Sequence, residues 1–272
     1  MGFPLLSNSF LSGNELREED LTFARSKKRF ALLRLSYQLK RLFKTLFGAR
    51  RLLRLCLIAE WIMRRFAFEL SCEVFGSRFQ ESALALSPEE LRQWIPTGGT
   101  VIDIGCGTGR WCRAVAPYVK HVVGIDYDVS SIEAARLSSQ HGNIEYIVGD
   151  VTLNELQKRQ FDTGLLIHVL EHIDDTDALL QSLRKMVDTL LIEVPDFDSD
   201  CLNLIRLELD CPFYSDGDHV REYTFPILQE QLRRTGWTIR QSKHQGGALL
   251  VIAGRGASPK VSAERAPGSV SR

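Results

Sequence analysis

From Thr100 to about residue 255, the chain alternates short apolar runs with segments whose apolar residues recur every three or four positions. The apolar runs are rich in β-branched residues and predict strands, and the amphipathic segments predict helices. Because helices follow most strands, right-handed crossovers in a mainly parallel sheet are expected. The expected strands are 100–104, 121–125, 144–148, 161–167, 188–194, 236–242 and 247–254, and the expected helices are 109–117, 130–140, 174–186 and 225–235.

The last two expected strands have no helical segment between them. Gln245, Gly246 and Gly247 supply a turn at this point, so the two strands are expected to form an antiparallel hairpin. The pattern as a whole predicts an α/β fold. Its core is a doubly wound, mainly parallel, seven-stranded sheet of Rossmann-like type with a C-terminal antiparallel hairpin.

The chain before residue 87 has a different pattern. Leucines at alternating spacings of three and four form one stripe on an expected helix at 27–47, and a second apolar helix is expected at 49–75. Ser87 and Pro88 are typical of the cap and first turn of a shorter helix. We therefore expect a poorly ordered start at 1–24, a helical extension at 25–86, an α/β domain at 87–256 and a disordered tail at 257–272.

Charge separates the extension from the rest of the chain. The chain has 34 basic and 34 acidic residues, but the segment 25–65 holds 13 basic residues and one acid, a net charge of +12. Three interpretations remain: a lid packed on the α/β domain, helices lying on an anionic membrane surface, and an arm that binds nucleic acid. We favour the lid, because the second helix offers the first a partner of similar character, and we rank nucleic acid last.

Other features of the composition favour a cytoplasmic protein. No apolar stretch reaches the ~18 uncharged residues of a membrane span. The first residues lack the basic start and apolar run of a secretory signal. The six cysteines have no zinc-binding spacing and are interpreted as reduced thiols. Peripheral contact with an anionic membrane through residues 27–70 stays open as an alternative.

The most informative motif is VIDIGCGTGR at residues 101–110. Here a strand ends in a glycine-rich turn that opens into a helix, so that the backbone and the helix N–H groups can approach a ligand closely. Arg110 stands where a dinucleotide-binding loop needs its third glycine. The next strand ends in Asp126, whose carboxylate can accept both hydroxyls of a ribose.

Together with segments at 143–151, 161–173, 191–196 and 219–224, this motif resembles the class I S-adenosylmethionine-dependent methyltransferases over about residues 90–255. The HVREYT segment at 219–224 is similar to the small-molecule branch, which includes quinone-precursor O-methyltransferases and methyltransferases of sugars and secondary metabolites. The resemblance implies that 87–256 binds S-adenosyl-L-methionine. It implies cofactor-binding roles for Asp103, Gly105, Cys106, Gly107, Gly109, Asp126, Tyr127, Asp150, Val151 and His168.

The resemblance also implies methyl transfer to a small molecule, most simply to a hydroxyl. Such an acceptor must lose its proton, and histidine titrates near neutral pH. His168, His172 and His219 are the candidate bases, each of them as readily a structural histidine, and Tyr223 comes next. No metal site is expected: Asp174, Asp175 and Asp177 are interpreted as a solvated helix start.

Two motifs of other methyltransferase classes are missing from the sequence. The fourth strand lacks an Asp/Asn-Pro-Pro-aromatic step, and Cys211-Pro212 has the reverse order of a cytosine-C5 nucleophile. Nucleic-acid bases and protein glutamine are thereby disfavoured as acceptors. Two hypotheses from other classes remain: a protein that binds the cofactor without catalysis, and a nucleic-acid-binding protein that uses the basic arm.

Overall fold

The computed structural model describes residues 27–76, 86–151, 156–212 and 217–256. They fall into two compact units. One unit comprises Met1–Ala85 with Asp200–Ser215, and the other comprises Leu86–Ser199 with Asp216–Arg272. The expected disordered segments 1–24 and 257–272 lie outside the described residues.

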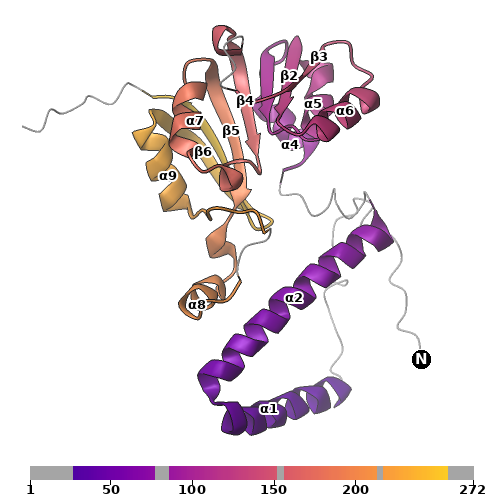
Figure 1. The fold of residues 1–272 in the computed structure, drawn as a ribbon, viewed down its shortest axis with the longest axis vertical. Helices are drawn as coiled ribbons and strands as arrows, with labels where there is room; N and C mark the ends of the chain where they lie inside the picture. The colour runs from indigo at the N-terminus through magenta and orange to yellow at the C-terminus, as the bar shows by residue number, and fades with distance from the viewer. Residues whose placement is uncertain (1–26, 77–85, 152–155, 213–216, 257–272) are drawn as a thin grey trace, which may run out of the picture. The chain divides into compact units, whose positions relative to one another are not determined.

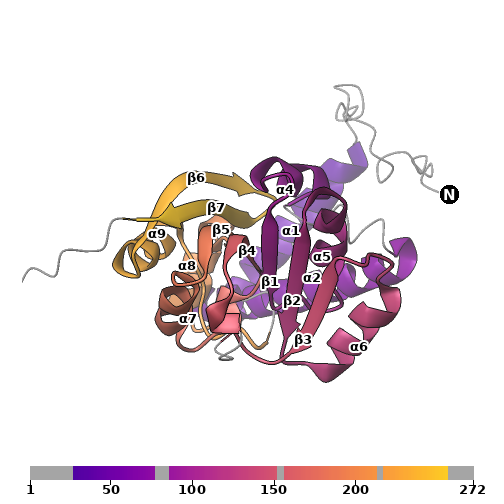
Figure 2. The ribbon, with the colours of Figure 1, turned by 90° about the horizontal axis from the view of Figure 1, so that it is seen from above.

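A seven-stranded sheet forms the centre of the larger unit in the described part of the chain, with the order β3-β2-β1-β4-β5-β7-β6 (Figure 1). Figure 2 shows the strands in this order, from β3 at one edge to β6 at the other. The five strands from β3 to β5 are parallel, and β7 is antiparallel to both β5 and β6. The strands are β1 Thr100–Ile104, β2 His121–Asp126, β3 Ile144–Val148, β4 Phe161–Ile167, β5 Val187–Pro195, β6 Trp237–Gln245 and β7 Ala248–Arg255.

Helices cover both faces of this sheet. Successive side chains of a strand point to opposite faces, so neighbouring residues meet different helices. Ile102 of β1 belongs to the apolar core that includes Leu180 and Leu228, which come from α7 and α9. Its neighbour Asp103 faces the other way and meets Cys112 of α5. The helices of this unit are α4 Pro88–Trp94, α5 Arg110–Val115, α6 Val129–Ser138, α7 Thr176–Leu183 and α9 Phe225–Arg234.

The predicted α/β fold is confirmed, including the antiparallel hairpin of β6 and β7. The expected strand ranges agree with the structure to within one to three residues at each end. One difference concerns the helix expected at 174–186. The segment Leu170–His172 forms a short 3₁₀ turn, η5, and α7 begins only at Thr176 because the Asp175 carboxylate caps it by accepting the Ala178 N–H.

The smaller unit contains α1 Lys27–Phe47, α2 Ala49–Phe75 and α8 Asn203–Glu208. The first two helices have the bounds that the sequence predicts. The sequence analysis did not anticipate α8, which comes between β5 and α9 in the chain. Leu57 of α2 is buried against Leu209 and Cys211, which follow α8, so a distant segment completes the apolar core of this unit.

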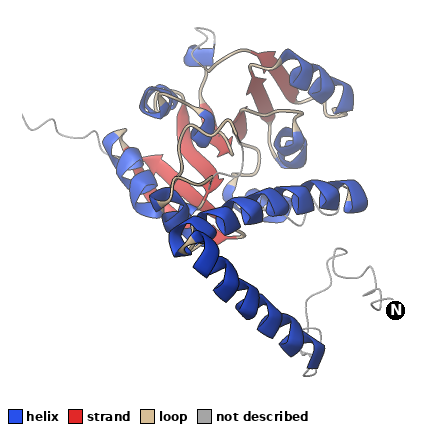
Figure 3. Cartoon of the chain, turned by 60° about the horizontal axis from the view of Figure 1, so that its bottom comes forward, coloured by secondary structure: helices blue, strands red, loops and turns tan. Residues whose placement is uncertain are grey.

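The leucine stripe of α1 is exposed in the structure. Leu35 is 51% exposed and Leu42 is 55% exposed. The expectation that α2 would serve as the packing partner of this stripe is therefore wrong. The physical reason is Gly48, whose φ of 77° turns the chain sharply between the helices. Figure 3 shows the two helices diverging from their junction.

A buried arginine joins α2 and α8. The side chain of Arg206 is 3% exposed, and its guanidinium donates to Glu60 Oε2 at 2.5 Å, Asp200 Oδ2 at 2.8 Å and Asn203 Oδ1 at 2.8 Å. Arg64 of α2 also donates to Glu60 and Asp200. The carboxylates of Glu60 and Asp200 thus each accept hydrogen bonds from both arginines. Arg206 is more deeply buried than Arg64.

We predict that Arg206→Ala lowers the stability of this unit by about 1–3 kcal/mol. A fully buried ion pair loses about 3–5 kcal/mol when one partner is removed, and here the carboxylates are partly solvated. The control is Arg50→Ala, because the Arg50–Glu208 pair is exposed on both sides and such pairs contribute about 0–1 kcal/mol. Thermal unfolding followed by far-UV circular dichroism measures both; equal losses would contradict the prediction.

Candidate active site

The glycine turn lies between β1 and α5, and its three glycines serve different purposes. All have positive φ angles: 67° at Gly105, 51° at Gly107 and 77° at Gly109. A Cβ at Gly105 would lie 2.8 Å from Val169 Cγ2, and one at Gly109 would overlap the Tyr146 ring. A Cβ at Gly107 would meet no atom of the described residues within 4 Å. Gly105 and Gly109 therefore permit packing, whereas Gly107 faces open space.

Asp126, at the end of β2, holds this turn in place. Its Oδ2 accepts the Gly107 N–H at 2.8 Å, and its Oδ1 accepts the Asp128 N–H at 2.9 Å. The Ile125 carbonyl accepts the N–H groups of the first two turn residues. The structure therefore brings together Gly107 and Asp126, two residues that the sequence analysis assigned to cofactor binding.

Asp103 lies beneath the turn. Its side chain is buried, and the Cys112 thiol donates to Oδ2 at 3.1 Å. Burial raises the pKa of Asp103 to about 7, against the opposing effect of the Cys112 hydrogen bond. Cys106 is buried as well. These positions fit a role in ordering the turn, and the cofactor-binding roles implied for Asp103 and Cys106 stay predictions.

The other residues assigned to the nucleoside part lie at the same edge of the sheet, because β2 and β3 are parallel and end together, with Asp126 paired to Val148. Tyr127 and Asp150 are exposed there. The Val151 side chain is buried in the apolar core, so only its backbone is available to a ligand. The cofactor-binding roles implied for these residues stay predictions.

His168 follows β4 at this edge and adopts an unusual backbone, with a φ of 54°. Its Nδ1 lies 3.1 Å from Glu171 Oε1, and its Nε2 lies 3.0 Å from Glu193 Oε1. Both carboxylates have no exposed side-chain surface. Its backbone N–H donates to the Glu193 carbonyl. The ring is therefore held between two buried acids.

This arrangement determines the charge of His168. Partial burial of the ring opposes protonation, but the hydrogen bonds that the ring donates to Glu171 and Glu193 outweigh it and raise the pKa of His168 to about 9. At neutral pH the ring is a cation that donates both N–H groups. It has no lone pair for a substrate proton, so this geometry does not suit His168 to the role of a base.

His172 and His219, the other two candidate histidines, lie together. Their rings meet edge to face, with centroids 4.8 Å apart. His219 Nδ1 lies 2.9 Å from Glu222 Oε1, and Asp218 Oδ2 lies 3.3 Å from His172 Nδ1. The Val220 N–H donates to the Glu171 carbonyl, which fastens the loop before α9 to η5. The structure thus brings two of the candidate bases into contact.

Sequence reasoning missed the acids that orient these histidines: Glu171, Glu193 and Glu222. Glu193 carried a readable signal, since a charged residue inside an otherwise apolar strand is buried only when it is paired. The other two stand next to His172 and three residues after His219. Tyr223, the next candidate base, is buried in the core, where its hydroxyl donates to Gln231 Oε1.

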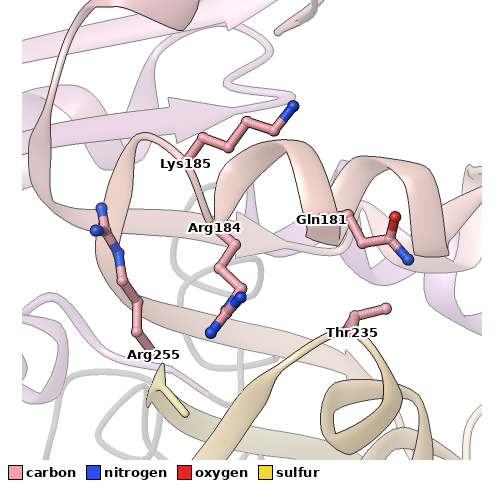
Figure 4. Close-up of a pocket in the computed structure, with 5 residues that line it drawn as sticks. All are labelled: Gln181, Arg184, Lys185, Thr235 and Arg255. Atoms are coloured by element: carbon pink, nitrogen blue, oxygen red, sulfur yellow. The ribbon is translucent and has the colours of Figure 1, made fainter. Parts of the chain in front are cut away.

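A cavity of about 340 Å³ lies at the opposite end of the strands, lined by Gln181, Arg184, Lys185, Thr235 and Arg255 (Figure 4). Arg255 shows that the cavity lies at this end, because it donates to the Val187 carbonyl at the start of β5. The Arg184 guanidinium donates to the carbonyls of Gly236 and Gly256. These cations hold neighbouring loops together, and the cavity is separate from the glycine turn and the histidines.

Comparison with known proteins accords with this geometry. Residues 77–242, more than half of the chain, match a family model described as a methyltransferase domain. The chain belongs to the methyltransferase domain family. The predicted resemblance to class I S-adenosylmethionine-dependent methyltransferases is thereby confirmed at the level of family and fold.

Several curated proteins are similar to this methyltransferase-domain chain over part of its length. A ubiquinone biosynthesis O-methyltransferase of Rhodopseudomonas palustris (strain TIE-1) is 32% identical over 111 residues, which are 40% of this chain and 41% of that protein. One of Mesorhizobium japonicum is 34% identical over 114 residues, 41% of this chain and 43% of that protein. The matches thus span about two fifths of these relatives.

Solved structures show the same fold. Magnesium protoporphyrin IX methyltransferase from Synechocystis, with bound SAH, has a TM-score of 0.51 at 16% identity, covering 62% of this chain and 81% of that chain. A protein from Methanosarcina mazei, described as among the SAM-dependent methyltransferases, has a TM-score of 0.51 at 16% identity, covering 64% and 99%. At this identity the likeness concerns the fold alone.

We predict that His168 stays protonated through neutral pH. Its pKa rises from 6.5 to about 9 on folding, so its ion pairs stabilise the fold fully below pH 6.5, and this contribution is lost as the pH rises through about 9. NMR titration of the ring should show the raised midpoint, and urea unfolding should show the alkaline loss of stability.

Glu193→Gln removes one of the two carboxylates that hold the ring. The titration midpoint of His168 should then fall towards 6.5, and the loss of stability should move to lower pH with it. The exposed His141 serves as the internal control, whose titration should not change. An unchanged His168 midpoint in the variant would show that the buried acid does not hold the proton.

Proposed function

We propose that the chain is an S-adenosylmethionine-dependent methyltransferase that transfers a methyl group to a hydroxyl of a small molecule. The observation that carries the proposal is the open space at Gly107, bordered by Asp126 at the carboxyl ends of parallel strands, where ligands bind in open α/β sheets. Family membership and relatives named as O-methyltransferases support it.

In this proposal the glycine turn receives the methionine part of the cofactor and Asp126 binds the ribose. Tyr127 lies against the adenine ring. The Asp150 carboxylate accepts a hydrogen bond from the adenine amino group, and the Val151 N–H donates one to the ring. Asp126 can take this role because its carboxylate is already oriented by two backbone N–H groups. Asp103 acts from below by fixing the turn.

The proposed reaction is an in-line displacement. The acceptor oxygen forms a bond to the methyl carbon as the carbon–sulfur bond breaks, which yields a methyl ether and S-adenosylhomocysteine. The hydroxyl proton must leave, and its loss makes the oxygen a better nucleophile. We assign this step to the cluster of Glu171, His172 and His219, since His168 is held as a cation.

Two experiments separate this proposal from its two alternatives. A protein that binds the cofactor without catalysis would retain binding but transfer no isotopic methyl group into a metabolite or lipid extract. A nucleic-acid-binding protein that uses the basic arm would retain RNA on a filter in a salt-sensitive manner. Transfer of label into an extracted small molecule supports the methyltransferase against both.

We predict that Gly107→Leu abolishes cofactor binding, because the new side chain would fill the space that the cofactor takes. Asp126→Ala should weaken binding by about 10- to 150-fold through loss of a charge-assisted hydrogen bond of about 1.5–3 kcal/mol. Calorimetry with S-adenosylhomocysteine measures both affinities.

The matched controls are Gly98→Leu and Asp188→Ala. Gly98 shares with Gly107 a positive φ, here 76°, and open space around it, but it lies before the start of β1. Asp188 pairs with Arg255 at the same far end of the strands. Both controls should bind like the unaltered chain. Undiminished binding by Gly107→Leu and Asp126→Ala together would exclude the proposed cofactor site.

We further propose that α1 and α2 bind an anionic membrane surface peripherally. The leucine stripe of α1, which α2 leaves uncovered, and the +12 charge of residues 25–65 support this proposal. Each basic residue near such a surface contributes about 1 kcal/mol. Among the described residues, no helix is both long and apolar enough to cross a bilayer. The lid remains the competing outcome of the test.

Flotation with vesicles tests this proposal. The full-length chain should float with anionic vesicles and not with neutral ones. High salt should release it, because exposed charges are screened over about 8 Å at physiological ionic strength. Leu35→Glu with Leu42→Glu should abolish flotation, whereas Leu137→Glu, at an exposed leucine of α6, should not. No flotation of the unaltered chain would favour the lid.

A further inference from the structure

Three side chains at the carboxyl end of β4 point ligand atoms at one small volume. Glu171, His172 and His219 each offer one donor atom, and all three atoms lie within 4.8 Å of one another. Ligands of a tetrahedral zinc ion at about 2.0–2.1 Å lie about 3.3–3.4 Å apart. Side-chain adjustments that shorten the separations by up to about 1.5 Å would thus bring the three atoms to metal-binding distance.

Glu171 supplies a second observation, independent of this spacing. Its side chain is completely buried, and His168 occupies only Oε1. The other oxygen, Oε2, is buried without a hydrogen-bond partner in the described parts of the chain. An unpaired buried acceptor costs about 1–3 kcal/mol, and more when it is charged. The two imidazoles beside it offer lone pairs that a cation can share.

The surroundings also fit a cation. Glu222 holds His219 through Nδ1, which leaves Nε2 as the nitrogen with a free coordination position. A carboxylate that orients a ligating histidine in this way is a usual feature of metal sites. Glu193 and Asp218 bring further negative charge close by, and the cation His168 balances only part of it.

We propose that Glu171, His172 and His219 form a binding site for a divalent transition metal, with zinc as the representative ion. Two imidazoles and one carboxylate are a ligand set typical of catalytic zinc, which leaves a further position for an oxygen. Of the three side chains, His172 is partly open to solvent, with 30% of its side chain exposed. The site requires neutral imidazoles, so a bound metal competes with protons for both rings.

The consequence for the reaction rests on the proposed function. A metal-bound hydroxyl has a strongly lowered pKa, so the cluster would lower the pKa of the acceptor hydroxyl through the ion and not as a free base. The site would thus select acceptors whose hydroxyl can reach the ion. An acceptor with two neighbouring oxygens would bind it better than one with an isolated hydroxyl.

The test is zinc titration of the full-length chain after treatment with a chelator and under reducing conditions, by competition with a chromophoric chelator. We expect one zinc ion per chain at this site. His172→Ala, His219→Ala and Glu171→Gln should each weaken binding at least about 100-fold, and Glu222→Gln about 10- to 100-fold. Cobalt in place of zinc should give visible absorption bands that His172→Ala removes.

The matched control is His121→Ala, since His121 pairs with Glu145 at the other end of the strands without a third ligand. Zinc affinity unaffected by the four cluster variants would overturn the proposal. Calorimetry with S-adenosylhomocysteine on the metal-free chain separates the two ideas. Cofactor binding without zinc binding refutes the metal site alone, and zinc binding without cofactor binding refutes the proposed function alone.

Discussion

The candidate site depends on one constraint, the burial of two carboxylates at the ends of adjacent parallel strands. Glu171 and Glu193 have no exposed side-chain surface, and a lone charge in such surroundings would be prohibitively unstable. His168 resolves this by placing a protonated ring between them. The left-handed backbone of His168 follows from this demand, and strain of this kind is usual where function requires a fixed geometry. The positions of η5 and of the loop before α9 follow in turn, because the Glu171 carbonyl accepts the Val220 N–H.

Much of the fold could be predicted because its signals are local. A strand such as β4 is an apolar run of its own, and the glycine turn with Asp126 depends on spacing within a short segment. The chemistry of the histidines could not be predicted in this way. Whether His168 is a base or a cation depends on Glu193, which lies 25 residues away in the sequence and one strand away in the sheet. Periodicity places Glu193 in β5 but does not identify its partner.

The helical unit shows a second limit of sequence reasoning. Leucine spacing predicts α1 and α2 correctly, since a stripe is a property of one helix. It does not predict what covers the stripe, because that depends on the direction of the chain after Gly48. The same holds for α8. Its sequence is short, and its role depends on α2, through the packing of Leu57 against Leu209 and Cys211 and through the Arg206–Glu60 pair.

The charges around the cluster explain why a single histidine would serve this site poorly. A sulfonium donor is itself a cation. A nearby histidine that takes the acceptor's proton becomes a second cation, which the sulfonium and His168 would repel. Buried acids offset both charges: Glu171 and Glu193 face His168, and Glu222 faces His219. A bound divalent ion would add positive charge, and the remaining negative charge of Glu171, together with Asp218 nearby, is what would make its binding favourable. The buried acids that hold His168 are thus also the condition for any cation chemistry at this edge of the sheet.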